Sequence, residues 1–188
     1  MSRGARTRPS TLVGAWVGNG LVTNLGDFES IATTTVGSGG AATITFSSIP
    51  ATYKHLQIRG ISRTATTENT IMRFNGDSTS SYRSHFLFGD GSSAGSGDFS
   101  FYTHNYLGNS TSTANVPAAF VIDILDYTST NKNKTTRTLM GFDTNGGGVV
   151  QLLSGLWINS ASAVNQITLS INTTNFAQYS SFALYGIK

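Results

Sequence analysis

Hydrophobic and polar residues alternate with a period of two along most of the chain, most clearly in residues 120–142. In the first half of this segment Phe120 and Ile122 fall on one face of an extended backbone, and in the second half Met140 and Phe142 do the same. This period indicates β-strands, because successive side chains leave opposite sides of a pleated backbone. The polar, Asn-rich sequence TSTNKNK between the halves is typical of a turn. The segment therefore predicts a β-hairpin with central strands as arms and these four side chains in the core.

The same alternation predicts further short strands, separated by turn signals about every dozen residues. The expected strands are 29–36, 42–46, 55–62, 70–74, 82–88, 98–107, 149–159, 167–171 and 179–187. The small residues of GDGSSAGSG at 89–97 predict a flexible linker. No segment has a helical period over three turns. The pattern favours an all-β protein, an antiparallel jelly-roll-like β-sandwich, with a Greek-key or immunoglobulin-like sandwich as the alternative.

Composition supports one strand-rich domain. Only 11% of the 188 residues are charged, against about 25% in ordinary soluble proteins. Polarity comes instead from 24 Ser, 26 Thr and 21 Gly, and Thr favours strands while Ser and Gly favour turns. The absence of Cys excludes a disulfide-stapled scaffold, a cysteine zinc site and a thiol nucleophile.

The first residues of the chain differ from the rest. Arg3, Arg6 and Arg8 precede the first acidic residue, Asp27, and the later nine basic residues balance the nine acidic ones. Without a strand or helix period, residues 1–27 predict an extended basic N-terminal arm, followed by a β-sandwich domain at 28–188. The side chains expected to bind a partner through this arm are Arg3, Arg6, Arg8, Leu12, Val13 and Trp16. Three arginines are too few to predict a nucleic-acid partner, and they can equally pair with carboxylates of a protein.

No catalytic, cofactor or metal site is expected. His55, His85 and His104 lack the spacing of metal ligands, and no nucleophile elbow or phosphate-binding loop occurs. A membrane partner is not expected either, because no apolar run approaches the about 18 residues that span a bilayer.

The acidic residues have ordinary structural interpretations. Asp123 and Asp126 are three residues apart, which places them on opposite faces of a strand and argues against a paired acid and base. We expect Asp123 to pair with a neighbouring cation and Asp126 to cap the hairpin turn. Asp77 and Asp90 are typical of turns, with calcium binding through oxygens as the alternative.

Aromatic residues are concentrated between positions 82 and 107, at Phe86, Phe88, Phe99, Phe101, Tyr102 and Tyr106. Such residues can form a stacking platform for sugars or single-stranded nucleic acid, but this stretch contains only one cation, Arg83. Packing in the core or at a subunit interface is therefore the main expectation. The candidate intersubunit or ligand surface consists of Tyr102, Tyr106 and the hairpin-tip residues Lys132 and Lys134.

Five segments resemble a family of bacteriophage virion structural proteins, which includes tail-fibre, head-fibre and capsid-decoration proteins. They are FSSIPATYKHLQIRGISR (46–63), FNGDSTSSY (74–82), VIDILDYTSTNKNKTTRTLMGFD (121–143), GLWINSASAVNQITL (155–169) and FAQYSSFALYGIK (176–188). The resemblance covers most of residues 28–188 and implies a β-sandwich module that assembles on the virion, commonly as a homotrimer. The arm lies outside the shared pattern and would select the place on the particle.

The resemblance leads to one main expectation of function and two alternatives. The main one is a non-enzymatic capsid decoration or cement protein on the virion surface, anchored by its arm on the major capsid protein or another virion protein. The first alternative is a tail-fibre or baseplate module that binds a host-surface glycan. The second is a glycan hydrolase on a jelly-roll scaffold, which requires two carboxylates facing one cleft, with Asp77 and Asp123 as the candidates.

Overall fold

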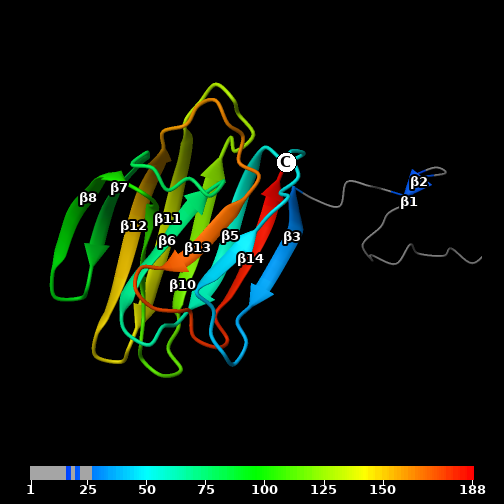
Figure 1. The fold of residues 1–188 in the computed structure, drawn as a ribbon. Helices are drawn as coiled ribbons and strands as arrows, with labels where there is room; N and C mark the ends of the chain where they lie inside the picture. Colours follow the sequence, from blue (N-terminus) through cyan, green and yellow to red (C-terminus); the bar gives the residue numbers. More distant parts are fainter. Residues whose placement is uncertain (1–15, 18–19, 22–26) are drawn as a thin grey trace, which may run out of the picture.

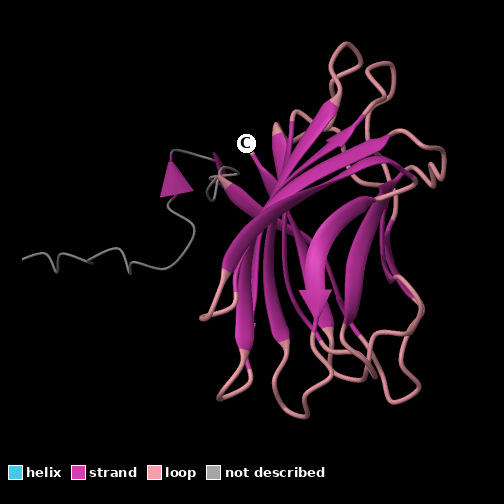
Figure 2. Cartoon of the chain, turned by 90° about the vertical axis from the view of Figure 1, so that its left-hand side faces the viewer, coloured by secondary structure: helices cyan, strands magenta, loops and turns pink. Residues whose placement is uncertain are grey.

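The computed structural model describes residues 16–17, 20–21 and 27–188, and these residues form β-strands and no helix. Two antiparallel sheets pack face to face as a sandwich (Figure 1), which confirms the all-β fold class expected from the alternating pattern. Figure 2 shows the same strands from the side, with loops gathered at both ends of the sandwich. The strands of the sandwich run from Phe28 to Ile187.

The large sheet has eight strands and the small sheet has four. The spatial order of the large sheet is β3 (Phe28–Thr35), β14 (Ser181–Ile187), β5 (His55–Ser62), β10 (Ala118–Leu125), β11 (Lys134–Asp143), β12 (Gly148–Trp157), β7 (Tyr82–Gly89) and β8 (Ala94–Tyr102). That of the small sheet is β4 (Thr43–Phe46), β13 (Ile167–Ile171), β6 (Glu68–Phe74) and β9 (Asn105–Ser110).

Eight of these strands nest as four pairs. The outermost pair along the chain is β3 with β14, followed by β4 with β13, β5 with β10 and β6 with β9. Successive pairs alternate between the large and the small sheet. The other four strands form two inserted hairpins, β7–β8 between β6 and β9, and β11–β12 between β10 and β13. Both insertions extend the large sheet beyond β10.

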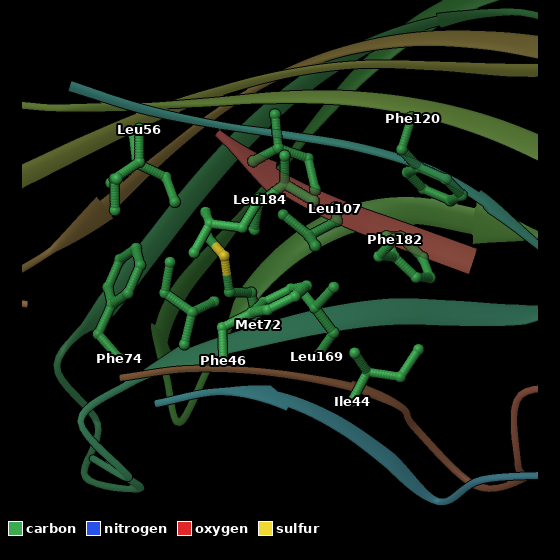
Figure 3. Packing of buried hydrophobic residues seen from close by; sticks show 14 of the residues in the cluster. Ile44, Phe46, Leu56, Met72, Phe74, Leu107, Phe120, Leu169, Phe182 and Leu184 are labelled. Atoms are coloured by element: carbon green, nitrogen blue, oxygen red, sulfur yellow. The ribbon is translucent and has the colours of Figure 1, made fainter. Parts of the chain in front are cut away.

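The hydrophobic core lies between the sheets. Figure 3 shows Ile44, Phe46 and Met72 of the small sheet facing Leu56, Phe120 and Leu184 of the large sheet. These side chains point inward because alternate residues of each strand share a face. The hairpin expected at 120–142 is present, with Phe120 opposite Met140 in the register of β10 and β11. Three of its four expected core residues are fully buried, and Phe142 is partly buried.

The expectation of one strand over residues 98–107 is wrong, because a bend at 103–104 separates β8 from β9. The flexible linker expected at 89–97 is also wrong in its second half, since β8 begins at Ala94. Gly97 lies opposite Phe86 of β7, and a Cβ atom on Gly97 would lie 2.6 Å from the Phe86 ring. Small residues here make room for aromatic rings on the neighbouring strand, and they do not mark a linker.

Most of the arm expected at 1–27 lies outside the described residues. Within it the structure describes two short strands, β1 (Trp16–Val17) and β2 (Gly20–Leu21), which pair antiparallel. The extended arm at 1–27 stays a prediction. At the other end of the described residues β14 lies between β3 and β5, so this last strand is held inside the large sheet.

Candidate functional site

The outward side of the large sheet, which faces away from the small sheet, carries a row of solvent-exposed hydrophobic side chains. Val121, Leu139, Leu152 and Leu87 lie opposite one another on β10, β11, β12 and β7. Each is between 38% and 59% exposed. Neighbouring strands are about 4.8 Å apart, so this apolar row is about 14 Å long. Contiguous exposed hydrophobic patches mark contact surfaces on soluble proteins.

A polar row runs beside the apolar row, two residues away on each of the same four strands. It consists of Asp123, Arg137, Ser154 and His85. Asp123 accepts hydrogen bonds from Gln57 Nε2 at 2.7 Å and from Arg137 Nη2 at 2.8 Å. The contact with Arg137 confirms that Asp123 pairs with a neighbouring cation. The Arg137 side chain is 70% exposed and that of Asp123 only 16%, so the pair presents mainly its positive member to solvent.

A groove of about 590 Å³ lies on the same outward side, over β7, β8, β11 and β12. Leu87 and Leu152 contribute to its hydrophobic lining, and His85, Asp98 and Arg137 contribute to its polar lining. A hydrophobic centre with polar residues around it is the usual composition of a protein–protein contact surface.

Sequence reasoning missed this apolar row, although a signal for it exists. The strands at 120–125 and 149–157 are hydrophobic on both faces, with Val121 and Leu152 opposite in direction to the core residues Phe120 and Leu153. Strands that are hydrophobic on both faces are typical of sheets in which another layer of protein covers each face. The small sheet covers the inner face, and nothing in the described residues covers the outer one.

The two lysines expected to project together from the hairpin tip lie in different environments. The Lys132 side chain is 63% exposed, and its Nζ lies 2.9 Å from Asp126, which lowers the pKa of that carboxyl. Lys134 is fully buried opposite Trp157, and its Nζ donates to the backbone carbonyls of Lys132 and Asn159 at 2.8 and 3.2 Å. Burial lowers the pKa of the Lys134 amine. The prediction that Lys134 lies on the surface is wrong, because it is the first inward-facing residue of β11.

Of the two candidate tyrosines, only Tyr102 is on the surface. It is 42% exposed at the end of β8, whereas Tyr106 of β9 is buried. The ring of Tyr106 packs edge-on against Phe99 and Phe86, with centroid distances of 5.0 and 5.6 Å. The aromatic residues of this region therefore pack mainly on one another, as expected. Tyr106 does not project from the surface, but it lines a pocket together with Tyr102.

The candidate residues of the arm are Arg3, Arg6, Arg8, Leu12, Val13 and Trp16. All but Trp16 lie outside the described residues, and of Trp16 only the backbone pairing with Leu21 in β1 and β2 is described. Their role in binding a partner stays a prediction.

The carboxylates that a hydrolase would require are in unrelated places. Asp123 lies on the outward face and pairs with Arg137, whereas Asp77 follows β6 and accepts a hydrogen bond from the indole Nε1 of Trp157 at 2.6 Å. Within residues 27–188 and the two short strands before them, no group of three or more His, Asp and Glu is placed to hold a metal ion. In the same described residues, no helix is long and apolar enough to cross a membrane.

Asp77 accepts four hydrogen bonds at one end of the sandwich. Besides the indole of Trp157, it accepts hydrogen bonds from the backbone and hydroxyl of Thr79 and from the hydroxyl of Ser81. Partial burial alone would raise its pKa, but the hydrogen bonds from Thr79, Trp157 and Ser81 together lower the pKa of Asp77 to about 2. This donor set leaves Asp77 ionised at neutral pH as a structural anchor of the loop.

No family model, curated protein or solved structure matches this chain. Proposals about its function therefore rest on its own residues and geometry.

Proposed function

We propose that this chain is a non-enzymatic structural protein on the surface of a bacteriophage particle. In this proposal it is a capsid decoration or cement protein, assembled as a homotrimer and bound to the major capsid protein or another virion protein. The N-terminal residues act as its anchor. The assignment to a phage particle comes from the resemblance of five segments in residues 46–188 to virion proteins.

The apolar row is the observation that carries a structural role. It presents hydrophobic side chains from four adjacent strands of one sheet, beside a hydrogen-bonded polar row. Surfaces of this kind fit another folded protein better than a small molecule. Three of the four strands that form the row, β11, β12 and β7, belong to the inserted hairpins. The insertions therefore build the proposed contact surface.

We further infer that the nested strand pairs form a jelly roll. In that topology two Greek keys place successive antiparallel pairs alternately in two sheets, as β3–β14, β4–β13, β5–β10 and β6–β9 are placed. Jelly rolls occur in viral capsid proteins and in lectins. The architecture is thus compatible with the proposed role and with the alternative below.

Imaging of the particle tests this proposal. Cryo-electron microscopy of virions of the phage that encodes this protein is expected to show sandwich-shaped density on the capsid shell. The N-terminal residues should run across major capsid subunits. Mass spectrometry of purified heads should detect the chain. Heads that contain none of this protein would contradict the proposal.

A second candidate function is a tail-fibre or baseplate module that binds a host-surface glycan. It is favoured by one observation, a small aromatic pocket beside Tyr102. Purified protein is then expected to bind host cells, and the substitution Tyr102→Ala should abolish the binding. Equal binding by both proteins, or none by either, would contradict this candidate.

A further inference from the structure

A pocket of about 200 Å³ opens between the end of β8 and the small sheet, on the opposite side of the large sheet from the apolar row. Its lining consists of Asn69, Phe99, Tyr102, His104, Tyr106 and Asn172. These residues supply three aromatic rings, an imidazole and two primary amides, and they include no carboxylate, lysine or arginine.

A β-bulge in β8 directs Tyr102 into this pocket. Tyr82 of β7 lies opposite Tyr102, but the next residue, Arg83, lies opposite Ser100, so β8 contains one extra residue. In a regular strand Phe99 and Tyr102 would point to opposite faces, because they are three positions apart. The bulge brings both rings to the inner side, where their centroids are 5.1 Å apart and their planes meet at 74°.

A second bulge lies beside the pocket in β9. Thr70 of β6 lies opposite Gly108, whereas the next residue, Ile71, lies opposite Tyr106. Gly108 has a φ of 103°, which favours glycine, and this irregularity accompanies the inward placement of Tyr106 against Phe99. Bulges next to binding sites re-aim side chains. Two bulges that meet at one pocket indicate a shaped site.

Several polar groups of the pocket make no hydrogen bond within the part of the chain that the structure describes. The side-chain amides of Asn69 and Asn172 and the hydroxyl of Tyr102 make no hydrogen bond to any described residue. The backbone N–H of Asn172 donates to the carbonyl of Asn69 at 3.1 Å and holds the two amides at the same edge of the pocket. A primary amide offers two donors and an acceptor, which match neighbouring hydroxyl groups of a ligand.

His104 adds a neutral imidazole to this lining. Burial and, second, the positive charge of Arg73 lower the pKa of His104 to about 4, so the ring is uncharged at neutral pH. Its Nδ1 lies 3.3 Å from the hydroxyl of Thr103, and a neutral imidazole offers one donor and one acceptor. The bend that carries His104 is held by a hydrogen bond from Arg73 Nε to the carbonyl of Thr103 at 2.9 Å.

We propose that this pocket binds one neutral sugar ring, whose hydrophobic C–H face packs on Tyr102 and Phe99 and whose hydroxyls bond to Asn69 and Asn172. Aromatic rings with a polar edge suit a ligand that is apolar on one side and polar on the other. A nucleic acid would require Lys or Arg for its phosphates, and neither lines the pocket. The volume is below the about 300–1,000 Å³ of sites for drug-sized ligands, which limits the ligand to about one ring.

A sugar is also the ligand that the second candidate function, binding of a host-surface glycan, requires. The evidence for this pocket is separate, because it comes from the two bulges and from the side-chain amides of Asn69 and Asn172. Its test therefore uses the isolated full chain and no phage particle. A failed titration would remove this site and leave the location of the protein on the particle untouched.

The experiment is an NMR titration of the ¹⁵N-labelled protein with the methyl glycosides of glucose, galactose, mannose, rhamnose and N-acetylglucosamine. Concentrations should reach about 50 mM, because a one-ring ligand binds in the millimolar range. We expect at least one glycoside to shift amide signals of residues 69, 99–106 and 172. The substitutions Tyr102→Ala and Asn172→Ala should each raise its dissociation constant about tenfold or more.

The control is Tyr179→Ala, which removes a tyrosine that is 73% exposed and does not line the pocket. This variant should bind as the unchanged protein does. The proposal is overturned if no glycoside shifts these signals, or if the shifts persist in both Tyr102→Ala and Asn172→Ala. Shifts that only the charged sugar glucuronate or a mononucleotide produces would also overturn it, since they indicate a different ligand class.

Discussion

Asp77 links the loop after β6 to the end of β12 through the indole of Trp157. Trp157 is almost fully buried, with its ring stacked on Tyr82 at a centroid distance of 6.4 Å and tilted against Phe74 at 5.5 Å. The indole N–H requires a partner there, because an unsatisfied buried donor costs about 1–3 kcal/mol. Asp77 supplies that partner at 2.6 Å. A loop residue is thus tied to the largest core side chain.

This contact predicts a pH-dependent part of the stability. Because the folded-state pKa of Asp77 is about 2, below its ordinary value of 3.8, its contribution is present above pH 3.8 and lost as the pH falls through about 2. Asp77→Asn should lower the free energy of unfolding by about 1–2 kcal/mol at pH 7 and by much less at pH 2. Urea denaturation at several pH values measures the difference.

The matched control is Asp98→Asn, which alters a carboxylate on the exposed edge strand with one hydroxyl donor, Ser100. It should change the unfolding free energy by less than about 0.5 kcal/mol. A deficit of Asp77→Asn that is the same at pH 7 and pH 2 would show that the ionised carboxylate is not the source of the effect.

Lys134 and Lys132 offer a second comparison at the scale of single residues. Lys134→Met keeps the length of the buried side chain but leaves the carbonyls of Lys132 and Asn159 without a donor. We expect it to lower the free energy of unfolding by about 1–3 kcal/mol. Lys132→Met removes only a largely exposed ion pair with Asp126 and should cost less than about 1 kcal/mol. Chemical denaturation of both variants checks the prediction, and the reverse order of stabilities would refute it.

At the scale of elements, the strands of the large sheet interlock through pairs of glycine and aromatic residues. Gly60 of β5 lies opposite Phe182 of β14, and a Cβ atom on Gly60 would lie 2.1 Å from the Phe182 ring. Phe182 is fully buried against Phe120 and Phe176 and has no room to move away. Because Gly60 has no side chain, the ring of Phe182 on β14 can occupy the space beside Gly60 on β5.

Gly60→Ala should accordingly destabilise the protein by about 1–3 kcal/mol, because overpacking displaces buried side chains. The control is Gly37→Ala in the loop after β3, where no atom lies within 4 Å of the new Cβ. That substitution should be neutral or slightly stabilising, since it reduces the freedom of the unfolded chain. Thermal unfolding followed by circular dichroism compares them, and equal midpoints would argue against this packing constraint.

The inserted hairpins show how an element acquires a second use. The strands β11, β12 and β7 contribute inward residues to the core, such as Met140, Leu153 and Tyr82, and outward residues to the apolar row. The same insertion, at the far end of β8, carries Tyr102 to the proposed sugar pocket. Both proposed surfaces thus depend on strands outside the four nested pairs.

At the scale of the whole molecule, the apolar row predicts self-association. As a trimer the protein should have a mass near three times the 19.9 kDa of one chain. Placing two carboxylates in the row, with Leu139→Asp and Leu152→Asp together, should yield monomers, because burying unpaired charges in an interface is costly. Both residues are about half exposed, at 53% and 47%, so the fold should tolerate the change. Light scattering coupled to size-exclusion chromatography measures the mass.

Thr45→Asp provides the control for this prediction. Thr45 is exposed on the outer side of the small sheet, and its substitution adds the same charge to the opposite face of the sandwich. This variant should remain associated like the unchanged protein. If the unchanged protein is a monomer, or if the double variant stays trimeric, the apolar row is not a subunit interface.

The sequence by itself determined the fold class and most of the strands. The strands at β5, β10, β11 and β13 were predicted closely, because the face on which a side chain lies follows from its two neighbours along the chain. Local chemistry also sufficed for the core positions of Phe120, Ile122 and Met140 and for the pairing of Asp123 with a cation. Each of these features depends on short stretches of chain.

Only the tertiary structure decided the features that depend on a second layer or on a partner strand. Leu139 and Leu152 are exposed because no element within the described residues covers the outer face of the large sheet, and Lys134 is buried because it lies opposite Trp157. The bulge that turns Tyr102 inward exists only in the register between β7 and β8. Periodicity along one strand determines which side chains share a face, but coverage and register are set by residues far away in the sequence.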